Sequence, residues 1–355
     1  MHLPRPCPGL PGLLIGLLSS LLLASCGAEP DLVVYISLDQ VFSAPLIDEF
    51  EAETGLTVRA EYDTEASKTV GLVKRIQEEA KRNPRCDVYW NNEIAQTVRL
   101  SEQGLLQPYD SPSAADIPAK FRDPEHLWTG FAARARVLIV NTELVPDSSS
   151  IRGMDDLLDE RWAGKAGIAR PLTGTTLTHA TALYQVLGEE RASAWLTAIA
   201  SGQHSDPPRV NVVGSNGQLM KLVGTGELAW GWTDTDDFRV AQLKGYPVRA
   251  ILPDQEAQPG ETEPLGTLLI PNTVAILKGA PHPDAAQRFV DWVLSREVEQ
   301  RLAEARSAQI PVRPDVPRPD HVRSDFAVMD VDYVELGRRI AERTETLKNL
   351  FLKTE

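Results

Sequence analysis

The sequence predicts an α/β protein with two lobes. Short apolar, β-rich segments alternate with segments whose apolar residues recur at helical spacing, the pattern of strands joined by helices. Without an N-terminal leader of 25 residues, 330 residues remain. This number exceeds the size at which a single hydrophobic core ordinarily stops growing. Two lobes imply a cleft between them in which a ligand can bind.

The N-terminal segment predicts export to the cell envelope. Arg5 gives a positive start, the apolar run that follows is too short to span a bilayer comfortably, and the run ends in Leu23-Ala24-Ser25-Cys26. This ending resembles the lipobox of bacterial lipoproteins, in which the cysteine becomes the lipidated first residue. We expect residues 1–25 to be a signal peptide, Cys26 the lipid anchor and residues 26–31 a tether. The alternative is an ordinary signal in which Cys26 is incidental.

The charge balance argues against nucleic acid as a partner. The full chain carries a net charge of −14, and loss of the leader removes Arg5 and no acidic residue, so the mature charge is −15. Such a balance favours a cationic ligand in a general way, although solubility alone accounts for many acidic surfaces. Once Cys7 and Cys26 are assigned to the leader and the anchor, Cys86 has no disulfide partner, and we expect it to be buried and unreactive.

The first lobe is predicted from residues 32–129 together with residues 254–325. Residues 32–38 form a continuous apolar run typical of a strand covered on both faces. A helix follows at 43–53, with Pro45 near its start and Gly55 just past its end. The alternation continues as strand 56–62, helix 67–82, strand 86–90, helix 94–103 and, after an irregular Pro- and Asp-rich connection at 108–124, strand 131–140.

The second lobe is predicted at residues 130–253. Its elements are expected as helix 154–160, strand 167–169, helices 177–187 and 189–200, strand 210–213, a helix capped by Ser215, strand 228–232, a helix from 234–237 to Gly245, and strand 248–252. The chain then returns to the first lobe through strand 266–277, broken at Pro271-Asn272, and one amphipathic helix at 285–306. Residues 326–355 form a helical extension whose stretch 333–351 is expected to pack on one lobe.

Candidate binding residues follow the ends of the predicted strands, where ligands bind in open α/β sheets because helix N-termini present unpaired N–H groups there. Thr173-Gly174-Thr175-Thr176 places hydroxyls and a glycine at a helix start, which suits a carboxylate, carbonate or phosphate. Plain helix capping is the alternative for these residues and for Ser215. The candidate ligand-binding residues are Asp39, Asn92, Glu93, Thr173, Gly174, Thr175, Ser215, Asn216, Asp236 and Asp237.

Three carboxylates, Asp234, Asp236 and Asp237, lie within four residues and offer the hard oxygen donors that suit a metal ion or an ammonium group. Acidic residues also stabilise a helix N-terminus through its dipole, which is the alternative and applies most to Asp234. An EF-hand is excluded because Phe238 stands at the fifth position and no glycine follows where the sharp turn needs one.

The chain offers little for catalysis. The histidines outside the leader, at 126, 179, 204, 282 and 321, lack zinc-site spacing, and His179 reads most simply as a partly buried helix residue. Nucleophile-elbow, Walker and dinucleotide glycine patterns are missing. We therefore expect a protein that is not an enzyme and needs no cofactor.

An ordered series of segments resembles the bacterial extracellular solute-binding proteins of ABC importers. The likeness runs through nearly all of residues 31–314 and is nearest to the ferric-iron-binding, or iron-deficiency-induced, branch. The segments that carry it are Val34-Tyr35-Ile36-Ser37, residues 50–58, residues 100–106, Gly174-Thr175, residues 224–229, residues 271–276 and the helix from Pro283 to Val298.

The resemblance implies the type II periplasmic-binding-protein fold, in which two α/β lobes joined by crossing hinge strands close over a ligand. It also implies a monomer that delivers a solute to an ABC permease and its ATPase. The iron branch commonly binds Fe³⁺ through adjacent tyrosines and an early histidine. Here Asp236 and Asp237 stand in place of the tyrosines, and the early histidine is missing near Asp39.

The leading hypothesis is a lipid-anchored binding protein for ferric iron or another hard metal. Its ligands would be Asp39, Glu93, Asp236 and Asp237, with a carbonate-like anion on residues 173–176. One alternative is an organic cation such as a polyamine, stacked on Trp90 or Trp232. Another is an oxyanion such as a phosphonate, bound without metal. A third class, an envelope hydrolase or lyase that uses Asp236 or Asp237 as a base, finds less support.

Overall fold

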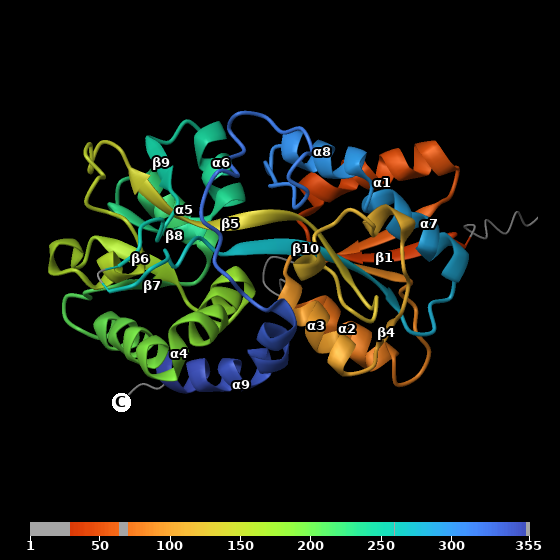
Figure 1. Ribbon diagram of the computed structural model, residues 1–355, viewed down its shortest axis with the longest axis horizontal. Helices are drawn as coiled ribbons and strands as arrows, with labels where there is room; N and C mark the ends of the chain where they lie inside the picture. The colour runs from red at the N-terminus through yellow and green to blue at the C-terminus, as the bar shows by residue number, and fades with distance from the viewer. Residues whose placement is uncertain (1–28, 64–69, 259, 353–355) are drawn as a thin grey trace, which may run out of the picture.

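Two α/β lobes are joined by a pair of long central strands in the computed structural model, which describes residues 29–63, 70–258 and 260–352 (Figure 1). The predicted signal peptide, Cys26 and the start of the helix expected at 67–82 lie outside the described residues. Within the described part of the chain, none of the helices is both long and apolar enough to cross a membrane.

Strands and helices alternate along most of the chain. They are β1 (Leu32–Ile36), β2 (Val58–Tyr62), β3 (Val88–Asn91), β4 (Leu106–Gln107), β5 (Thr129–Asn141), β6 (Ala166–Ala169), β7 (Asn211–Val213), β8 (Trp230–Asp234), β9 (Val248–Ile251) and β10 (Leu269–Leu277).

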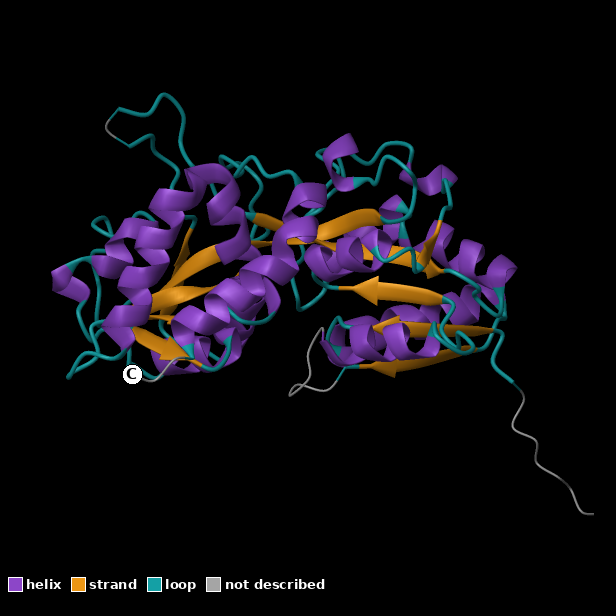
Figure 2. Ribbon diagram, turned by 90° about the horizontal axis from the view of Figure 1, so that it is seen from below, coloured by secondary structure: helices purple, strands orange, loops and turns teal. Residues whose placement is uncertain are grey.

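The helices cover the faces of these strands (Figure 2). They are α1 (Gln40–Thr54), α2 (Val70–Glu79), α3 (Ile94–Glu102), α4 (Gly174–Gln203), α5 (Asn216–Gly224), α6 (Thr235–Leu243), α7 (Pro283–Val293), α8 (Arg296–Glu304) and α9 (Tyr333–Phe351). Short 3₁₀ turns at Pro112–Ala114, Ala119–Phe121, Met154–Leu158 and Glu160–Trp162 complete the connections.

The strands form one continuous path with the order β2-β1-β3-β10-β5-β8-β6-β7, while β4 pairs with β10 and β9 pairs with β5. The first lobe is built on β1 to β4 and β10, and the second lobe on β6 to β9. The strand β5 belongs to both, because Ala135 faces Leu269 of β10 and the next residue, Arg136, faces Asp234 of β8. The expected two-lobed α/β fold with crossing strands is confirmed, while the numerical lobe boundaries stay a prediction.

Burial explains why the crossing strand is stable. Every residue of β5 is buried, and most are apolar, as a strand covered on both faces requires. The register of the β10–β5 pair shifts between Pro271 and Asn272, where the sequence predicted an interruption. In the first lobe, Trp90 packs between Phe131 and Phe289. Cys86 is buried and free, as expected, and burial raises the pKa of its thiol.

Two element predictions were wrong in detail. The helix expected at 154–160 is two 3₁₀ turns. The single helix expected at 285–306 divides into α7 and α8, because the Ser295 hydroxyl accepts the N–H of Val298 and starts a new helix. The two helices expected at 177–187 and 189–200 are confirmed, because Gly188, with a non-helical φ of 78°, divides α4 at the predicted junction.

The C-terminal helix α9 contacts both lobes, whereas the sequence suggested one (Figure 1). On the first-lobe side, Gly337 lies so close to α3 that a Cβ atom there would be 2.3 Å from Cβ of Val98. On the second-lobe side, the Arg343 guanidinium lies 2.7 Å from Glu189 and 4.0 Å from the ring centroid of Tyr184. The helix therefore bridges the lobes on the side of the central strands opposite to α6 and α8.

Candidate functional site

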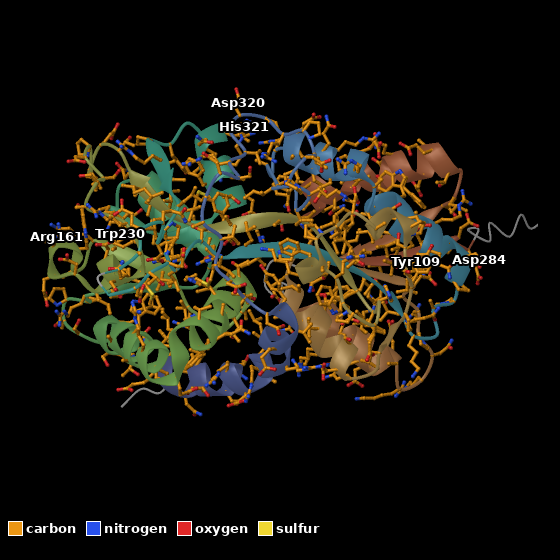
Figure 3. All side chains as sticks on the ribbon, in the orientation of Figure 1. Tyr109, Arg161, Trp230, Asp284, Asp320 and His321 are labelled. Carbon is orange, nitrogen blue, oxygen red and sulfur yellow. The ribbon has the colours of Figure 1, made fainter. Side chains whose placement is uncertain are left out.

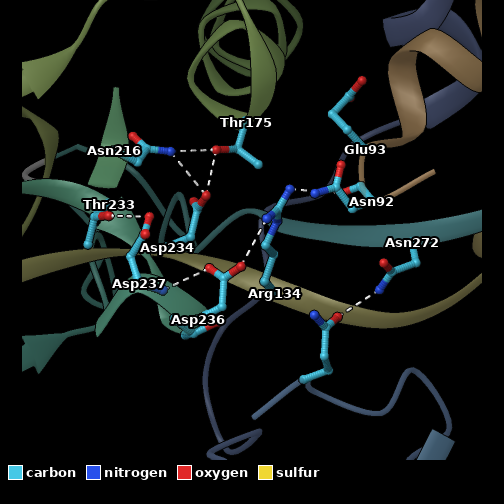
Figure 4. Close-up of polar contacts among 12 residues, drawn as sticks. Asn92, Glu93, Arg134, Thr175, Asn216, Thr233, Asp234, Asp236, Asp237 and Asn272 are labelled. Carbon is cyan, nitrogen blue, oxygen red and sulfur yellow. Dashed lines mark hydrogen bonds and ion pairs between the residues drawn. The ribbon is translucent and has the colours of Figure 1, made fainter. Parts of the chain in front are cut away.

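The N-termini of α3, α4, α5 and α6 converge beside β5 and form the candidate site (Figure 4). Each of these helices follows a strand of one of the two lobes, so their first turns lie beyond the carboxyl ends of those strands. The candidate site is thus assembled from residues of both lobes.

Asp234 is the centre of the second-lobe part of the site. It is the last residue of β8, not the first of a helix, and its side chain is buried. Its carboxylate accepts hydrogen bonds from Arg136 at 2.6 Å, from the Thr175 hydroxyl at 2.6 Å and from the Asn216 amide at 3.1 Å. Burial opposes ionisation of Asp234, but Arg136 and Arg134 hold its pKa below the ordinary value, so it is an anion.

Arg134 joins the two lobes at the site. Its guanidinium donates to Asp236 Oδ2 at 3.0 Å in the second lobe and to the backbone carbonyl of Asn92 at 2.8 Å in the first (Figure 4). Although burial works against its charge, Asp236 and Asp234 raise the pKa of Arg134. A single cation therefore holds the first turn of α6 against the end of β3.

Asp237 is the carboxyl of the site that keeps a proton at neutral pH. Burial raises its pKa to about 8, and the neighbouring charges of Asp236 and Asp234 add to that effect, against a hydrogen bond from the Thr233 hydroxyl at 2.9 Å. Asp234, Asp236 and Asp237 form a close acidic group. In the part of the chain that the structure describes, one carboxylate oxygen of each lies within 4.8 Å of the other two.

Glu93 approaches the site from the first lobe. Its carboxylate caps α3 by accepting the N–H groups of Ala95 at 2.7 Å and Gln96 at 3.1 Å, and it accepts the hydroxyl of Thr178 at 2.5 Å. Because Thr178 lies on α4, this hydrogen bond crosses between the lobes. Burial raises the pKa of Glu93, while these hydrogen bonds work against that rise.

The other predicted site residues lie at the helix starts. Thr173 is the exposed N-cap residue of α4 but makes no capping hydrogen bond, and Gly174, with φ of 57°, leaves open space at the first turn. Ser215 does cap α5 by accepting the N–H of Gln218 at 3.1 Å. Asp39 precedes α1 without a capping hydrogen bond and does not belong to the close group of three aspartates.

Arg134 and Arg136 were missed at the sequence level, because the strand that carries them reads as an apolar run. The signal was present: two arginines at a spacing of two share one face of a strand and, when buried, need anions beside them. Nε and Nη2 of Arg136 and Nε of Arg134 are buried without a hydrogen-bond partner among the described residues. The site thus combines three carboxyl groups with guanidinium groups that have donors to spare.

His179, Trp90 and Trp232 are buried and are not placed to bind a cation. His179 is buried 4.7 Å from the Trp232 ring, and burial together with Arg136 lowers its pKa to about 3, so the imidazole is neutral. Trp90 and Trp232 are completely buried, and Trp90 is part of the first-lobe core. In this arrangement, neither indole offers a free face to an organic cation.

Comparison with known proteins gives a consistent family. Residues 45–330 match the model for a bacterial extracellular solute-binding protein. Iron uptake protein A1 of Synechocystis sp. is 26% identical over 349 residues, covering 92% of each chain.

Solved structures give the same fold. The Trichodesmium protein IdiA (FutA), in complex with iron and citrate, is 23% identical with a TM-score of 0.74, covering 91% of this chain and 99% of that chain. AfuA of Actinobacillus pleuropneumoniae, with fructose-6-phosphate bound, is 22% identical with a TM-score of 0.76 and the same coverage. At these identities the two structures establish the architecture only.

Proposed function

The chain belongs to the bacterial extracellular solute-binding proteins, and from that premise we propose that it serves an ABC importer and carries ferric iron together with a small oxyanion. The observation that carries the proposal is the approach of Asp234, Asp236 and Asp237 to within 4.8 Å of one another at a site built from both lobes. Hard oxygen ligands suit a hard trivalent cation. The name and 26% identity of the Synechocystis iron uptake protein point in the same direction.

The two arginines explain why an oxyanion belongs to the proposed cargo. A bare Fe³⁺ ion beside Arg134 and Arg136 would meet two fixed positive charges. A carbonate or citrate bound to the metal would instead accept their unused N–H groups, in the manner of charge-assisted hydrogen bonds. The exposed first turn of α4 at Thr173 and Gly174 offers further N–H groups to the same anion.

Metal capture would rearrange the present contacts. Asp236 would exchange its hydrogen bond with Arg134 for the metal, and Asp237 would release its proton. We propose these two residues as the metal ligands from the second lobe. Asp39 and Glu93 are the proposed ligands from the first lobe, and binding through Glu93 would require Thr178 to let go of the carboxylate. Thr175, Ser215 and Asn216 are the proposed supporting contacts.

A ligand screen by thermal shift tests this proposal, because a ligand that prefers the native state raises the melting temperature. We expect ferric citrate, or Fe³⁺ with carbonate, to stabilise the wild-type protein and the control Asp330→Asn, which changes an exposed acid. Asp236→Asn should lose that shift. Equal shifts in both variants would place the metal elsewhere and contradict the proposal.

The second candidate cargo is an oxyanion without metal, such as a phosphonate. The observation that favours it is the unpartnered Nε and Nη2 of Arg136 beside Thr175 and Asn216. In the same screen, 2-aminoethylphosphonate or phosphate would then raise the melting temperature of chelator-treated protein, while ferric citrate would not. A polyamine is disfavoured, because the indoles proposed to stack against it are buried in the protein.

We also propose that Cys26 carries the lipid that holds the protein at the membrane, next to the permease and ATPase that accept the cargo. Support comes from the apolar run that ends in Leu23-Ala24-Ser25-Cys26. We expect a monomer that binds its cargo stoichiometrically and forms no product from it. Cys26→Ser should move the protein from the membrane fraction to the soluble fraction, and an unchanged distribution would contradict the anchor.

A further inference from the structure

A pocket lies on the face of β5 opposite to the candidate site. Its volume is about 80 Å³, and it is open to solvent. Arg134 and Arg136 point to the candidate site, where the proposed cargo binds and which is hereafter the cargo site. Val137, the next residue along the strand, lines this pocket instead. Residues of α6 and β9 form one wall, and the segment that follows α8, with Ala308 and Ile310, forms the other. The pocket therefore lies where the chain passes between the lobes.

The walls are held in place by backbone contacts. Ala133 of β5 and Ile310 exchange two backbone hydrogen bonds of 2.6 Å, so the segment after α8 runs along the crossing strand. The hydroxyl of Thr235, at the start of α6, accepts the N–H of Ala135 at 3.1 Å. These contacts fix the pocket from both sides of β5 and make it part of the folded structure.

The pocket has an apolar floor and a rim that carries two arginines. Val137, Phe238, Leu252 and Ile310 supply apolar surface, while Arg239, His321 and Arg323 stand at the edge. Burial and the charge of Arg239 lower the pKa of His321, so its imidazole adds no positive charge at neutral pH. Figure 3 shows His321 at the top of the molecule, next to α6. This arrangement is unusual in a chain whose net charge is −14.

Arg239 is the rim residue without a counter-ion. No carboxylate of the described residues lies within ion-pair distance of it; Nη1 has only a long contact of 3.3 Å with Gln242, and its buried Nε has no partner there. Arg323, by contrast, is paired with Asp325 at 3.2 Å. A guanidinium with unused donors above an apolar floor suits one class of ligand: a small organic acid whose apolar body enters the pocket while its anionic group stays at the rim.

We propose that this pocket is a second binding site, for a small molecule that joins an aromatic or branched aliphatic body to a carboxylate or phosphate group. The site is separate from the cargo site, and it does not depend on what the cargo is. Both sites use α6, whose first turn carries Asp236 and Asp237 while its later residues, Phe238 and Arg239, face the pocket.

Calorimetric titration of the purified protein with phenyl phosphate tests the proposal. We expect saturable binding to the wild-type protein, and none of benzylamine, which has a similar body and the opposite charge. Arg239→Met, which keeps the aliphatic stem, should weaken binding about tenfold or more. Gln242→Glu, an exposed change that adds a negative charge at the rim, should also weaken it. The control Arg249→Met, at an exposed arginine of β9 outside the pocket, should not.

Thr175→Ala distinguishes this pocket from the cargo site, since Thr175 contacts only the latter. We expect phenyl phosphate to bind this variant as it binds the wild type. The proposal would be overturned by absence of saturable binding to the wild-type protein, by equal weakening in the Arg239 and Arg249 variants, or by loss of binding in Thr175→Ala with retention in Arg239→Met.

Discussion

Asp237 couples the site to pH because its pKa of about 8 lies far above its ordinary value of 3.8. Between these values the native protein retains a proton that the unfolded chain has released. The contribution of Asp237 to stability is therefore complete at low pH and is lost as the pH rises toward about 8. The same proton must leave when Asp237 binds a metal ion, so cargo affinity should rise over the same range.

The first prediction concerns the cargo-free protein. Between about pH 5 and pH 8 the melting temperature of the wild type should fall relative to that of Asp237→Asn, which has no proton to lose. Melting curves of the two proteins at a series of pH values measure this difference. Burial also raises the pKa of Asp254 to about 7. Because Asp254 is present in both proteins, its effect on the melting temperature cancels in the comparison. Parallel curves would show that Asp237 does not titrate in this range.

The second prediction concerns the buried Arg136–Asp234 pair, in which the side chains are 0% and 3% exposed. Arg136→Gln leaves a buried carboxylate without its cation and should lower the free energy of unfolding by about 3–5 kcal/mol. The double variant Arg136→Gln with Asp234→Asn should recover much of that loss, since no uncompensated charge remains. Chemical denaturation of the single and double variants measures the coupling, and strictly additive losses would argue against it.

At the scale of the elements, α9 depends on close approach to α3. Gly337→Ala places a methyl group 2.3 Å from Cβ of Val98, so the helix must move away, at a cost of about 1–3 kcal/mol in unfolding free energy. Thr346→Ala, at an exposed position of the same helix, is the control and should change stability little. Denaturant titration of both variants tests this third prediction, which fails if Gly337→Ala is as stable as the wild type.

Local signals predicted the elements well where capping and periodicity agree. The start of α5 at Ser215 and the full extent of α9 at 333–351 follow from such signals. Ser295 misled the prediction of a single helix, because a serine within a long amphipathic pattern can be either a helix residue or a cap. The bridging role of α9 was not predictable, since its amphipathic face does not specify which helix covers it.

The sequence predicted the turns of the candidate site and its acidic residues, but not its arginines. Thr175, Asn216 and Asp236 became candidates because they follow strands, and the structure places them around Asp234. The arginines of β5 were missed because one sequence does not show which residue a buried charge will pair with. Arg134 reaches Asp236, 102 residues further along the chain, and only the tertiary fold makes that contact.

At the scale of the whole molecule, direct polar contacts at the site connect the two lobes. One is the 2.5 Å hydrogen bond from Thr178 to Glu93. Thr178→Val removes that donor and leaves a buried carboxylate with one partner fewer, so the fourth prediction is a larger share of open molecules in the cargo-free protein. Small-angle X-ray scattering of the cargo-free protein should then give a larger radius of gyration.

Thr181→Val is the matched control for this variant. Thr181 is also buried in α4, but its hydroxyl donates at 2.9 Å to Leu177 within the same helix. It should therefore leave the radius of gyration unchanged. If both variants scatter like the wild type, the Glu93–Thr178 contact does not hold the lobes together.

Diffraction at the iron absorption edge from crystals grown with ferric citrate tests the central claim most directly. We predict an anomalous peak between the lobes, in contact with the carboxylate oxygens of Asp236 and Asp237, with the citrate against Arg134 or Arg136. A peak away from these aspartates would contradict the account. So would citrate or phosphate bound at the arginines without any iron signal.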